Sequence, residues 1–372
     1  MYTIISMTKK PKMPQLNIRL FLAIGLSITA FLVCITAFVV LYDGLRREPL
    51  VLQLISGEVS EKKPLIQETN FIAVGDMMFS RNVARHAEKS WSPQWIWEHI
   101  HDFLAQADFI FWNLEWPTNG TNKYSYQSTL TFNAVPDLIR TLPNVGFMIV
   151  NLANNHILDQ GEAGIRATTK ILSEIHIQTT WASEDPEKVW EPSIIEKNGI
   201  RIAFIGASYA AYNDNGSGQS PLVARMQEDK KLVTAIQKAK EKADIIVITM
   251  HAGQEYTRTP TELQKNFAHT AIDAGADIVI GAHPHWVQTV EKYRDKYIFY
   301  SLGNFIFDQE FSPETKSGLA LQIFVRKTAS ETSLTHILLK PIIIENYGQP
   351  RLANDQEAQK ILDTIQQKNI LY

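Results

Sequence analysis

The sequence predicts an α/β fold, on the strength of three observations. Short apolar runs alternate with amphipathic helical segments along most of the chain. Polar residues gather directly after several of these runs. The composition, 45% hydrophobic and 20% charged, is typical of a globular protein with a sizeable core. Because ligands of open α/β sheets bind at the carboxyl ends of strands, the polar residues there are candidates for a functional site.

The N-terminal part predicts a membrane anchor. Residues 20–42 contain no charged side chain, and a helix of that length crosses a bilayer core of about 30 Å. Residues 1–19 carry three lysines, one arginine and no acid, so the positive-inside rule keeps them in the cytoplasm and sends the rest outside. A cleaved signal peptide is the alternative, but the apolar run is long for one and lacks a close small-x-small site. We therefore expect a single-pass protein of the cell membrane with an extracytoplasmic main domain.

The remaining chain divides into a linker, a main domain and a tail. Residues 43–69 are mixed and polar, residues 70–348 carry the alternating pattern, and residues 349–372 are predicted as a helical tail. The formal net charge is −3, and removing the four cations of residues 1–19 leaves −7. A mildly acidic chain without a basic tract excludes nucleic acid as a partner. The single cysteine, Cys34, excludes an intrachain disulfide.

Seven short apolar runs predict the strands of the main domain. Each run is rich in β-branched or aromatic residues, as strands are. The runs are residues 71–74, 109–112, 147–150, 200–206, 245–250, 276–280 and 297–300. Residues 318–325 and 334–345 predict two further strands joined by a polar turn.

Helices are predicted between several of these strands. Thr259 followed by Pro260 and Glu262 has the pattern of a capping box, and Gly275 is a good C-terminal stop. After Gly161, the residues Ile165, Thr169, Leu172 and Ile175 share one helical face. A final helix is predicted from about residue 356 to 368.

The stretch Gly281-Ala282-His283-Pro284-His285 is the strongest local indication of a metal site. Two imidazoles two positions apart face the same way when the chain is extended, and imidazole binds divalent transition metals. The proline stiffens the backbone between them. By itself this pattern also fits two histidines in a turn. The residues at the other strand ends therefore have to distinguish a metal site from a turn.

Those ends supply the residue types of a two-metal hydrolase. Carboxylates bridge and neutralise the ions, imidazoles complete the ligand shells, and a spare imidazole acts as an acid or stabilises an oxyanion. Taken singly, each residue has a plainer interpretation as a turn, a helix cap, a surface carboxylate or a core histidine. Five such clusters in one chain are hard to explain as unrelated turns. The candidates are Asp76, Glu115, Asn155, His156, His251, His283 and His285.

These residues belong to six motifs that follow one another between about residues 71 and 308. The motifs are Gly75-Asp76-Met77-Met78-Phe79-Ser80-Arg81, Asn113-Leu114-Glu115, Ala153-Asn154-Asn155-His156, His251-Ala252-Gly253-Gln254-Glu255-Tyr256, Gly281-Ala282-His283-Pro284-His285 and Ser301-Leu302-Gly303-Asn304-Phe305. The series resembles the CapA family of poly-γ-glutamate capsule biosynthesis proteins, whose single N-terminal anchor and external domain also fit.

The resemblance implies a fold and a role for each motif residue. The implied fold is a four-layer α/β/β/α sandwich of the calcineurin-like metallophosphoesterase type with a dimetal site. Glu115 would stand where the bridging aspartate of such enzymes sits, and His156 would be the catalytic imidazole. The implied metal ligands are Asp76, Glu115, Asn155, His251, His283 and His285, and the other implied pocket residues are Arg81, Asn113, Asn154, Glu255 and Asn304.

Two positions depart from the phosphoesterase pattern. Met78 occupies the place of a histidine, and a thioether is a poor ligand for hard divalent ions. Glu115 replaces the usual aspartate. The capsule family shares both differences, so they support the resemblance while weakening the inference of two full metal sites and of phosphoesterase activity.

We expect a membrane-anchored accessory protein of capsule production that binds or cleaves an anionic polymer such as poly-γ-glutamate. Its expected cofactors are one or two divalent ions (Mn, Zn or Fe), and its expected partners include membrane synthase subunits. Two alternatives remain open: an extracytoplasmic metal-dependent phosphoesterase of the nucleotidase kind, and a non-catalytic scaffold of a polymer synthase or export complex. The near-complete ligand set argues against the scaffold, and Met78 argues mildly for it.

Overall fold

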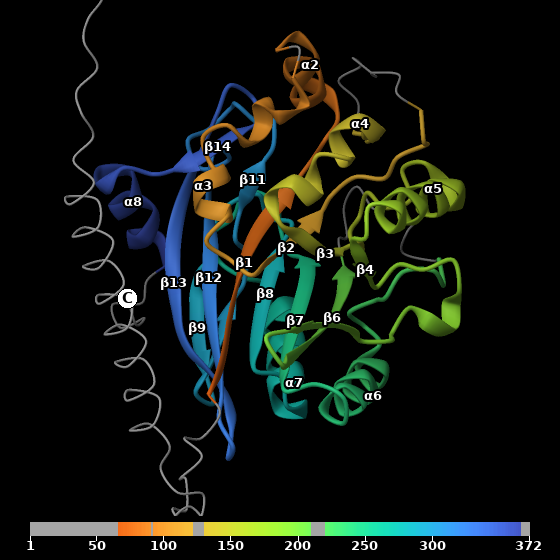
Figure 1. Ribbon diagram of the computed structural model, residues 1–372, viewed down its shortest axis with the longest axis vertical. Helices are drawn as coiled ribbons and strands as arrows, with labels where there is room; N and C mark the ends of the chain where they lie inside the picture. Colours follow the sequence, from red (N-terminus) through yellow and green to blue (C-terminus); the bar gives the residue numbers. More distant parts are fainter. Residues whose placement is uncertain (1–65, 91, 122–129, 210–219, 366–372) are drawn as a thin grey trace, which may run out of the picture. The chain divides into compact units, whose positions relative to one another are not determined.

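The computed structural model describes residues 66–90, 92–121, 130–209 and 220–365 (Figure 1). The predicted stub, the predicted membrane helix of residues 20–42 and nearly all of the linker lie outside these residues. Within the described ranges, the structure contains no helix that is both long and apolar enough to span a membrane.

Two mixed β-sheets form the centre of the fold. The first has the strand order β14-β13-β12-β1-β2-β3-β4, and β11 pairs with β1 beside it. Strands β1 to β4 run parallel, whereas β12, β13 and β14 are antiparallel additions. The strands are β1 (Gln67–Met77), β2 (Phe109–Leu114), β3 (Phe147–Asn151), β4 (Gln178–Thr180), β11 (Asn304–Ile306), β12 (Ser317–Lys327), β13 (Thr332–Glu345) and β14 (Gln349–Leu352).

The second sheet has the order β5-β6-β7-β8-β10-β9. Its four inner strands are parallel, and an antiparallel strand closes each edge. The strands are β5 (Ser193–Lys197), β6 (Ile200–Tyr209), β7 (Ile245–Ala252), β8 (Ile278–Ala282), β9 (Val290–Tyr293) and β10 (Lys296–Phe299). Each of the seven predicted apolar runs overlaps a strand, which confirms the α/β class.

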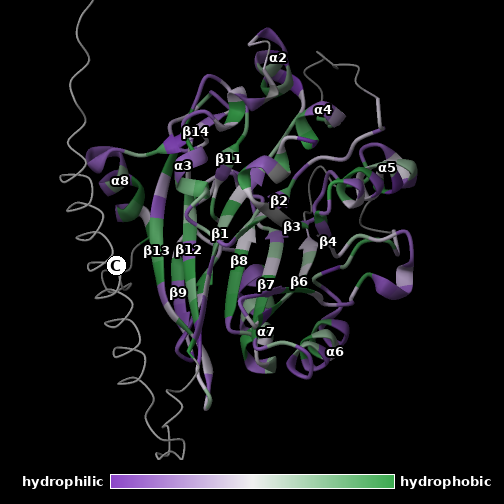
Figure 2. Ribbon diagram, viewed as in Figure 1, coloured by the Kyte–Doolittle hydropathy of each residue, from purple (hydrophilic) through white to green (hydrophobic). Residues whose placement is uncertain are grey.

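Aromatic rings join the two sheets. The ring of Phe204 on β6 lies 5.8 Å from that of Phe71, 6.2 Å from that of Phe109 and 5.0 Å from that of Phe111, which come from β1 and β2. Aromatic side chains bury large areas, and such edge and offset contacts favour close packing. Figure 2 shows hydrophobic strands in both sheets, as expected for strands buried on both faces.

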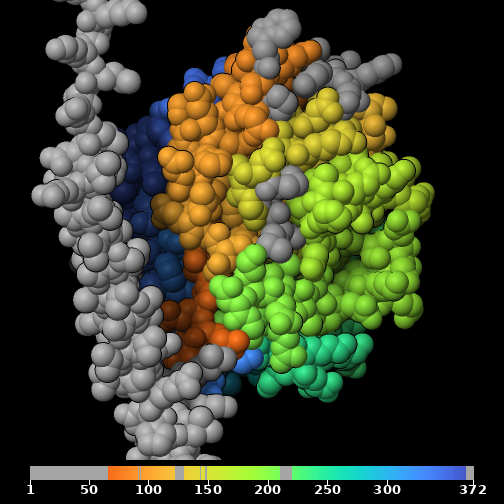
Figure 3. Space-filling view, in the orientation of Figure 1, coloured from red at the N-terminus to blue at the C-terminus, as the bar shows by residue number. Residues whose placement is uncertain are grey.

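Helices cover the sheets. Helices α6 and α7 contact the second sheet, while the 3₁₀ turn η2, α5 and α8 contact β3, β4 and β13 of the first sheet. Figure 3 shows the orange-to-green segments of the chain closing one face of the fold. The helices are α2 (Arg81–Lys89), α3 (His101–Leu104), α4 (Pro136–Ile139), α5 (Gly161–Glu174), α6 (Asp229–Lys240), α7 (Glu262–Ala274) and α8 (Asp355–Leu362), and the 3₁₀ turns include η1 (Pro93–Trp97) and η2 (Leu142–Val145).

The start of α7 corrects one prediction. The capping box is formed by Thr261 and Gln264, two residues later than the predicted Thr259 and Glu262. Both pairs fit the same pattern, so the sequence alone does not choose between them. The helix ends at Gly275, which is left-handed (φ 116°), as predicted.

The C-terminal part differs from its prediction at one point. Strands β12 and β13 occupy the predicted places, but residues 349–352, predicted as part of a helical tail, form β14. These residues pair with Ile342–Glu345 of β13, which leaves α8 to begin at Asp355 with Asn354 as its N-cap. The domain also starts slightly early, because residues 67–69 already pair with β12.

The parallel strands bring the predicted polar residues to one edge. On the first sheet Asp76 pairs in register with Asn113 and with Asn304, and Asn113 pairs with Asn151. On the second sheet His251 pairs with Ala282, directly before His283. The carboxyl ends of β1, β2, β3, β7 and β8 therefore meet in one region.

Candidate metal centre

Asp76 ends strand β1 and lies completely buried. The preceding Gly75 lets the end of β1 lie close to the backbone of Gly303, because a Cβ at residue 75 would lie 1.9 Å from the carbonyl oxygen of Gly303. One carboxylate oxygen of Asp76 accepts a hydrogen bond from Asn113 Nδ2 at 2.7 Å, and the other accepts from the backbone N–H of His283 at 3.1 Å. The side chain thus joins the first sheet to the histidine loop of the second.

Glu115 follows β2 and is also fully buried. Neither of its carboxylate oxygens accepts a hydrogen bond from the described residues. Burial, together with the charges of Asp76 and Glu255, raises the pKa of Glu115 well above its usual value. A buried carboxylate without a donor is costly, and buried charges in proteins are usually paired or bound to metals. The environment of Glu115 therefore fits a divalent cation.

Two groups of potential ligands share this carboxylate. Glu115, His251 and His283 form one group, and Asp76, Glu115 and His285 form the other, with the ligand atoms of each group within 4.8 Å of one another. Carboxylate oxygens and imidazole nitrogens together suit Zn, Mn or Fe. A carboxylate common to two groups is the arrangement that a two-metal site requires.

His251 ends β7 between two asparagine side chains. Its Nε2 hydrogen bonds to Asn155 Oδ1 at 2.7 Å, and its Nδ1 lies 3.0 Å from Asn113 Nδ2. Because an amide oxygen accepts and an amide nitrogen donates, this pattern places the ring hydrogen on Nε2. Binding of one ion by both His251 and Asn155 requires that their mutual hydrogen bond break.

The histidine loop has an unusual backbone. His283 and His285 have positive φ angles of 99° and 58°, which non-glycine residues rarely adopt. Strained residues of this kind cluster at functional sites, where neighbouring groups hold them in place. Here the backbone N–H of His283 donates to Asp76, and Gly281 lets β8 approach β10, since a Cβ there would meet the carbonyl oxygen of Tyr300 at 2.0 Å.

The two clustered rings, His251 and His283, are kept neutral. Burial, and the charge that neighbouring histidines would carry, lower the pKa of both well below the usual value. The Nδ1 atom of His283 is buried and makes no hydrogen bond with the described residues. Metals bind neutral imidazole, so a deprotonated ring with an unpaired nitrogen fits a ligand role.

His285 is oriented by Asn304. Its Nδ1 lies 2.9 Å from Asn304 Oδ1, which accepts the Nδ1 hydrogen and leaves Nε2 as the ligand atom of the neutral ring. That Nε2 lies 3.7 Å from Glu115 Oε1. Metal-binding histidines commonly donate their second ring N–H to an oxygen in this way.

His156 contacts the same carboxylate from another side. Its Nε2 lies 3.8 Å from Glu115 Oε1, while its Nδ1 lies 2.9 Å from Asp159 Oδ2. An ionised carboxylate only accepts, so Asp159 holds the hydrogen on Nδ1 and fixes the ring orientation. The ring also stacks on Phe132 with centroids 3.9 Å apart. His156 is thereby placed to give or take a proton at Nε2.

The remaining predicted pocket residues divide by function. Asn113 and Asn304 contact ligand side chains directly. Asn154 faces away, since its amide donates to the carbonyl of Leu114 and its oxygen accepts from the backbone of His156. It holds the loop and does not line the site.

Arg81 and Glu255 are not part of the two ligand groups, although the charge of each acts on Glu115. Arg81 forms an ion pair with Asp308 and lies over the rings of Phe132 and Phe307. Glu255 lines a neighbouring cavity of about 520 Å³ together with His283.

Met78 takes no part in the ligand groups. Its sulfur is buried and accepts hydrogen bonds from the backbone and hydroxyl of Ser80, at 3.0 and 2.9 Å. The thioether thus braces the start of α2. Phosphoesterases carry a histidine at this position, whereas Met78 adds no ligand to either of the two groups that share Glu115.

Sequence reasoning missed several residues that the site uses. Asp159 follows His156 by three positions within a turn, a spacing that could have indicated a dyad. Asn151 donates to Asn113 Oδ1 at 2.7 Å, and its place after the third apolar run was a usable signal. No local pattern indicated Asp308, because its partner Arg81 lies 227 residues away in the sequence.

Residues 70–309 match the sequence profile of the family described as bacterial capsule synthesis protein PGA_cap. The chain is 32% identical over 261 residues to the capsule biosynthesis protein CapA of Bacillus anthracis, covering 68% of this chain and 63% of that protein. It is 28% identical over 262 residues to the PGA biosynthesis protein CapA of Bacillus subtilis strain 168, covering 69% of this chain and 68% of that protein. It thus aligns with less than two thirds of the length of the B. anthracis relative.

Among solved structures, the chain is similar to the calcineurin-like phosphoesterase YfkN of Bacillus subtilis. The TM-score is 0.48 at 14% identity, and the match covers 81% of this chain and 98% of that chain.

Proposed function

Because the chain belongs to the PGA_cap family of bacterial capsule synthesis proteins, we propose that it is an accessory protein of poly-γ-glutamate capsule production. In this proposal the metal centre binds a segment of the polymer and hydrolyses an amide bond within it. The names of two relatives, a capsule biosynthesis protein and a PGA biosynthesis protein, support the part in capsule production.

One observation carries the hydrolytic part of the proposal. Glu115 is a fully buried carboxylate without a hydrogen bond from the described residues, and it belongs to both groups of potential metal ligands. Bound divalent ions would supply Lewis-acid polarisation of the carbonyl group under attack and positive charge for the carboxylates of the polymer. The acidic chain otherwise offers an anionic polymer little attraction.

The chain's own residues supply orientation and proton transfer. Asp76, His285, His251 and His283 surround Glu115 from the two sheets and would hold the ions. His156 Nε2 faces the same carboxylate and can protonate the leaving nitrogen, while Asp159 keeps the opposite ring nitrogen engaged.

A phosphoesterase is the second candidate function. The sharing of Glu115 between two ligand groups supports it, because phosphatases use pairs of ions to bind both oxygens of a displacement. The same residues would then act on a small phosphoester outside the cell.

We also propose that residues 20–42 anchor the protein as a single span, with the main domain outside and synthase subunits as neighbours. The uncharged run and the cations of residues 1–19 support this orientation.

The decisive experiment compares two substrates. The full-length chain, supplied with Mn or Zn, is incubated with poly-γ-glutamate or with chromogenic phosphate monoesters and diesters, beside His156→Ala. Shortening of the polymer by the wild type, with loss of at least about a hundredfold of the rate in the variant, supports the amide hydrolase. Phosphate ester cleavage alone establishes the second candidate. No turnover of either substrate contradicts both and favours the non-catalytic scaffold.

A further inference from the structure

A cavity of about 520 Å³ opens beside His283, one of the proposed metal ligands. Its volume is within the range of sites for small molecules. A substrate held at the metal centre can therefore extend a neighbouring group into this cavity. The walls come from the end of β6, the loop after β7, the start of α7 and the histidine loop, and they include Tyr209, Gln254, Glu255, Tyr256, Leu263 and His283.

The loop that carries Glu255 is fixed to the histidine loop. The backbone N–H of Tyr256 donates to the carbonyl of Pro284 at 2.9 Å, and the ring of Tyr256 stacks on His285 with centroids 6.0 Å apart. Tyr256 also has a positive φ of 59°, which non-glycine residues rarely adopt. Strained positions of this kind cluster at functional sites. Glu255 is thus held beside the metal ligands.

The charge of this cavity is not balanced. Among the described residues that line it, Glu255 is the one carboxylate, and none is a lysine or an arginine. Burial, together with the charge of Glu255, raises the pKa of Tyr256, so its hydroxyl stays neutral and hydrogen bonds to Glu255. Arg81, whose charge also acts on Tyr256, is paired with Asp308. The carboxylate of Glu255 is therefore suited to attract a cationic group.

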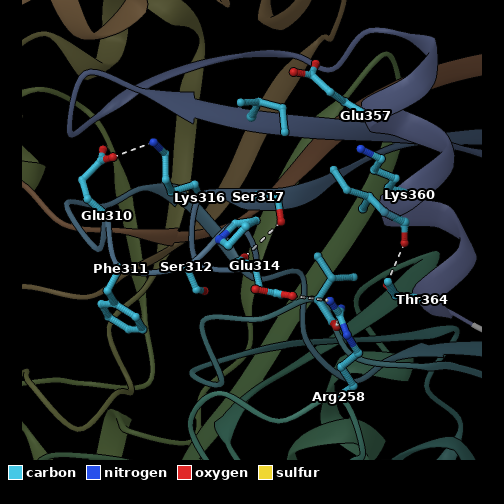
Figure 4. A pocket seen from close by; sticks show the side chains of 14 residues that line it. Arg258, Glu310, Phe311, Ser312, Glu314, Lys316, Ser317, Glu357, Lys360 and Thr364 are labelled. Atoms are coloured by element: carbon cyan, nitrogen blue, oxygen red, sulfur yellow. Dashed lines mark hydrogen bonds and ion pairs between the residues drawn. The ribbon is translucent and has the colours of Figure 1, made fainter.

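A larger cavity of about 680 Å³ differs in this respect. Three acidic and three basic side chains line it, and Figure 4 shows Glu310 facing Lys316 and Glu314 facing Arg258. Balanced charge gives that cavity no preference for an ion of either sign, whereas the cavity beside His283 favours a cation.

A polymer of γ-linked glutamate carries a cation only at its amino end. Each interior residue brings an α-carboxylate and a neutral amide, whereas the first residue has a free α-amino group that is largely protonated near neutral pH. Four bonds separate this nitrogen from the γ-carbonyl carbon of the same residue, about 5 Å in an extended chain. Aromatic rings, here those of Tyr209 and Tyr256, add attraction for an ammonium group.

We propose that this cavity binds the amino-terminal residue of the polymer, with its α-ammonium group on Glu255 and its γ-carbonyl group at the metal centre. The inference rests on the proposed function and specifies which amide bond is cut. The hydroxyl of Tyr209 and the side-chain amide of Gln254 are donors for the α-carboxylate of the bound residue.

The reaction then shortens the polymer from its amino end. Water adds its oxygen to the γ-carbonyl carbon of the first residue, and the bond from that carbon to the nitrogen of the second residue breaks. This nitrogen takes up a proton as it leaves. The products are free glutamate and a chain that is one residue shorter and has a new amino terminus.

Blocking the amino end tests this subsite without any change in the protein. The full-length chain, supplied with Mn, is incubated with a synthetic γ-linked glutamate decamer whose amino end is either free or acetylated. Mass spectrometry records free glutamate and the shortened chains. The free decamer should lose one residue at a time, and acetylation should lower the rate by at least about tenfold, because a hydrogen bond between two charged groups is lost.

Glu255→Gln removes the charge and keeps the size of the side chain. We expect this variant to cleave the free decamer at least about tenfold more slowly than the wild type and to lose the preference for a free amino end. Its metal content should match that of the wild type, because Glu255 belongs to neither ligand group. Glu174→Gln, at an exposed glutamate on α5, is the matched control and should keep both the rate and the preference.

The outcomes separate this subsite from the proposed function. Equal cleavage of the free and the acetylated decamer by the wild type overturns the amino-terminal subsite and leaves the amide hydrolase in place. A Glu255→Gln variant that keeps the preference of the wild type overturns the role of Glu255. Failure of the wild type to cleave either decamer overturns the proposed function, and the subsite with it.

Discussion

Oε1 of Glu115 lies 3.7 Å from Nε2 of His285, although the two residues come from different sheets. Asn304 holds the other nitrogen of the His285 ring at 2.9 Å. A buried carboxylate beside an imidazole nitrogen is suited to hold a cation between them. The predictions below follow from this relationship and from the residues that support it.

Asn304→Ala removes the acceptor that fixes the ring of His285. Loss of such a supporting partner lowers metal affinity by about 10- to 100-fold. Titration with Mn or Zn measures the effect, and Asn144→Ala, an exposed asparagine in η2, serves as the control. Unchanged affinity in Asn304→Ala would show that Asn304 does not orient a ligand.

Asp159→Asn removes the charge beside His156 Nδ1 without changing the size of the side chain. We expect turnover to fall by about 10²-fold or more, because the ring loses its fixed tautomer. Metal content should stay the same, since Asp159 belongs to neither ligand group. Loss of bound metal in this variant would place Asp159 in the metal site and contradict its assignment to His156.

Glu115→Gln tests the buried carboxylate in metal-free protein. The folded chain raises the pKa of Glu115, so folded Glu115 keeps a proton that unfolded Glu115 releases above about pH 4.5. The stability from this group is full below about pH 4.5 and is lost as the pH rises through the folded pKa, by up to about 1.4 kcal/mol per pH unit.

Glutamine does not ionise, so Glu115→Gln should gain stability relative to the wild type as the pH rises from about 4.5 to the folded pKa of Glu115. Urea unfolding in the presence of a chelator measures the difference between the two proteins. A difference that does not change with pH would mean that the pKa of Glu115 is not raised in the folded chain.

Gly75→Ala tests the close approach that positions Asp76. The added Cβ would lie 1.9 Å from the carbonyl oxygen of Gly303, so strands β1 and β11 must separate. We expect a loss of about 3 kcal/mol in the free energy of unfolding, together with weaker metal binding. Gly161→Ala meets no atom within 4 Å and adds only the strain of its positive φ, about 1 kcal/mol. Equal metal affinity in the two variants would contradict the role assigned to Gly75.

The strand ends could be predicted because apolar runs of four or more residues precede them. Asp76, Glu115, His251 and His283 each follow such a run, and parallel strands bring their ends to one edge. Strand β4 has only three residues, and the edge strands β5 and β9 are partly exposed, so a search for continuous apolar runs misses them.

Other features depended on contacts that no local pattern reports. The pairing of residues 349–352 with β13 decides that this segment is a strand. The ion pair between Arg81 and Asp308 joins residues far apart in the sequence. The support of Tyr256 by Gln309 likewise appears only in the folded chain.

Bound metal tests the central claim most directly. The full-length chain and a His283→Ala/His285→Ala variant are equilibrated with Mn or Zn and desalted, and the metal per chain is measured by mass spectrometry. We predict that the wild type keeps at least one ion per chain, up to the two that its ligand groups allow, and that the variant, which loses a ligand from each group, keeps almost none. No retained metal in the wild type, or equal metal in both proteins, would contradict the metal centre.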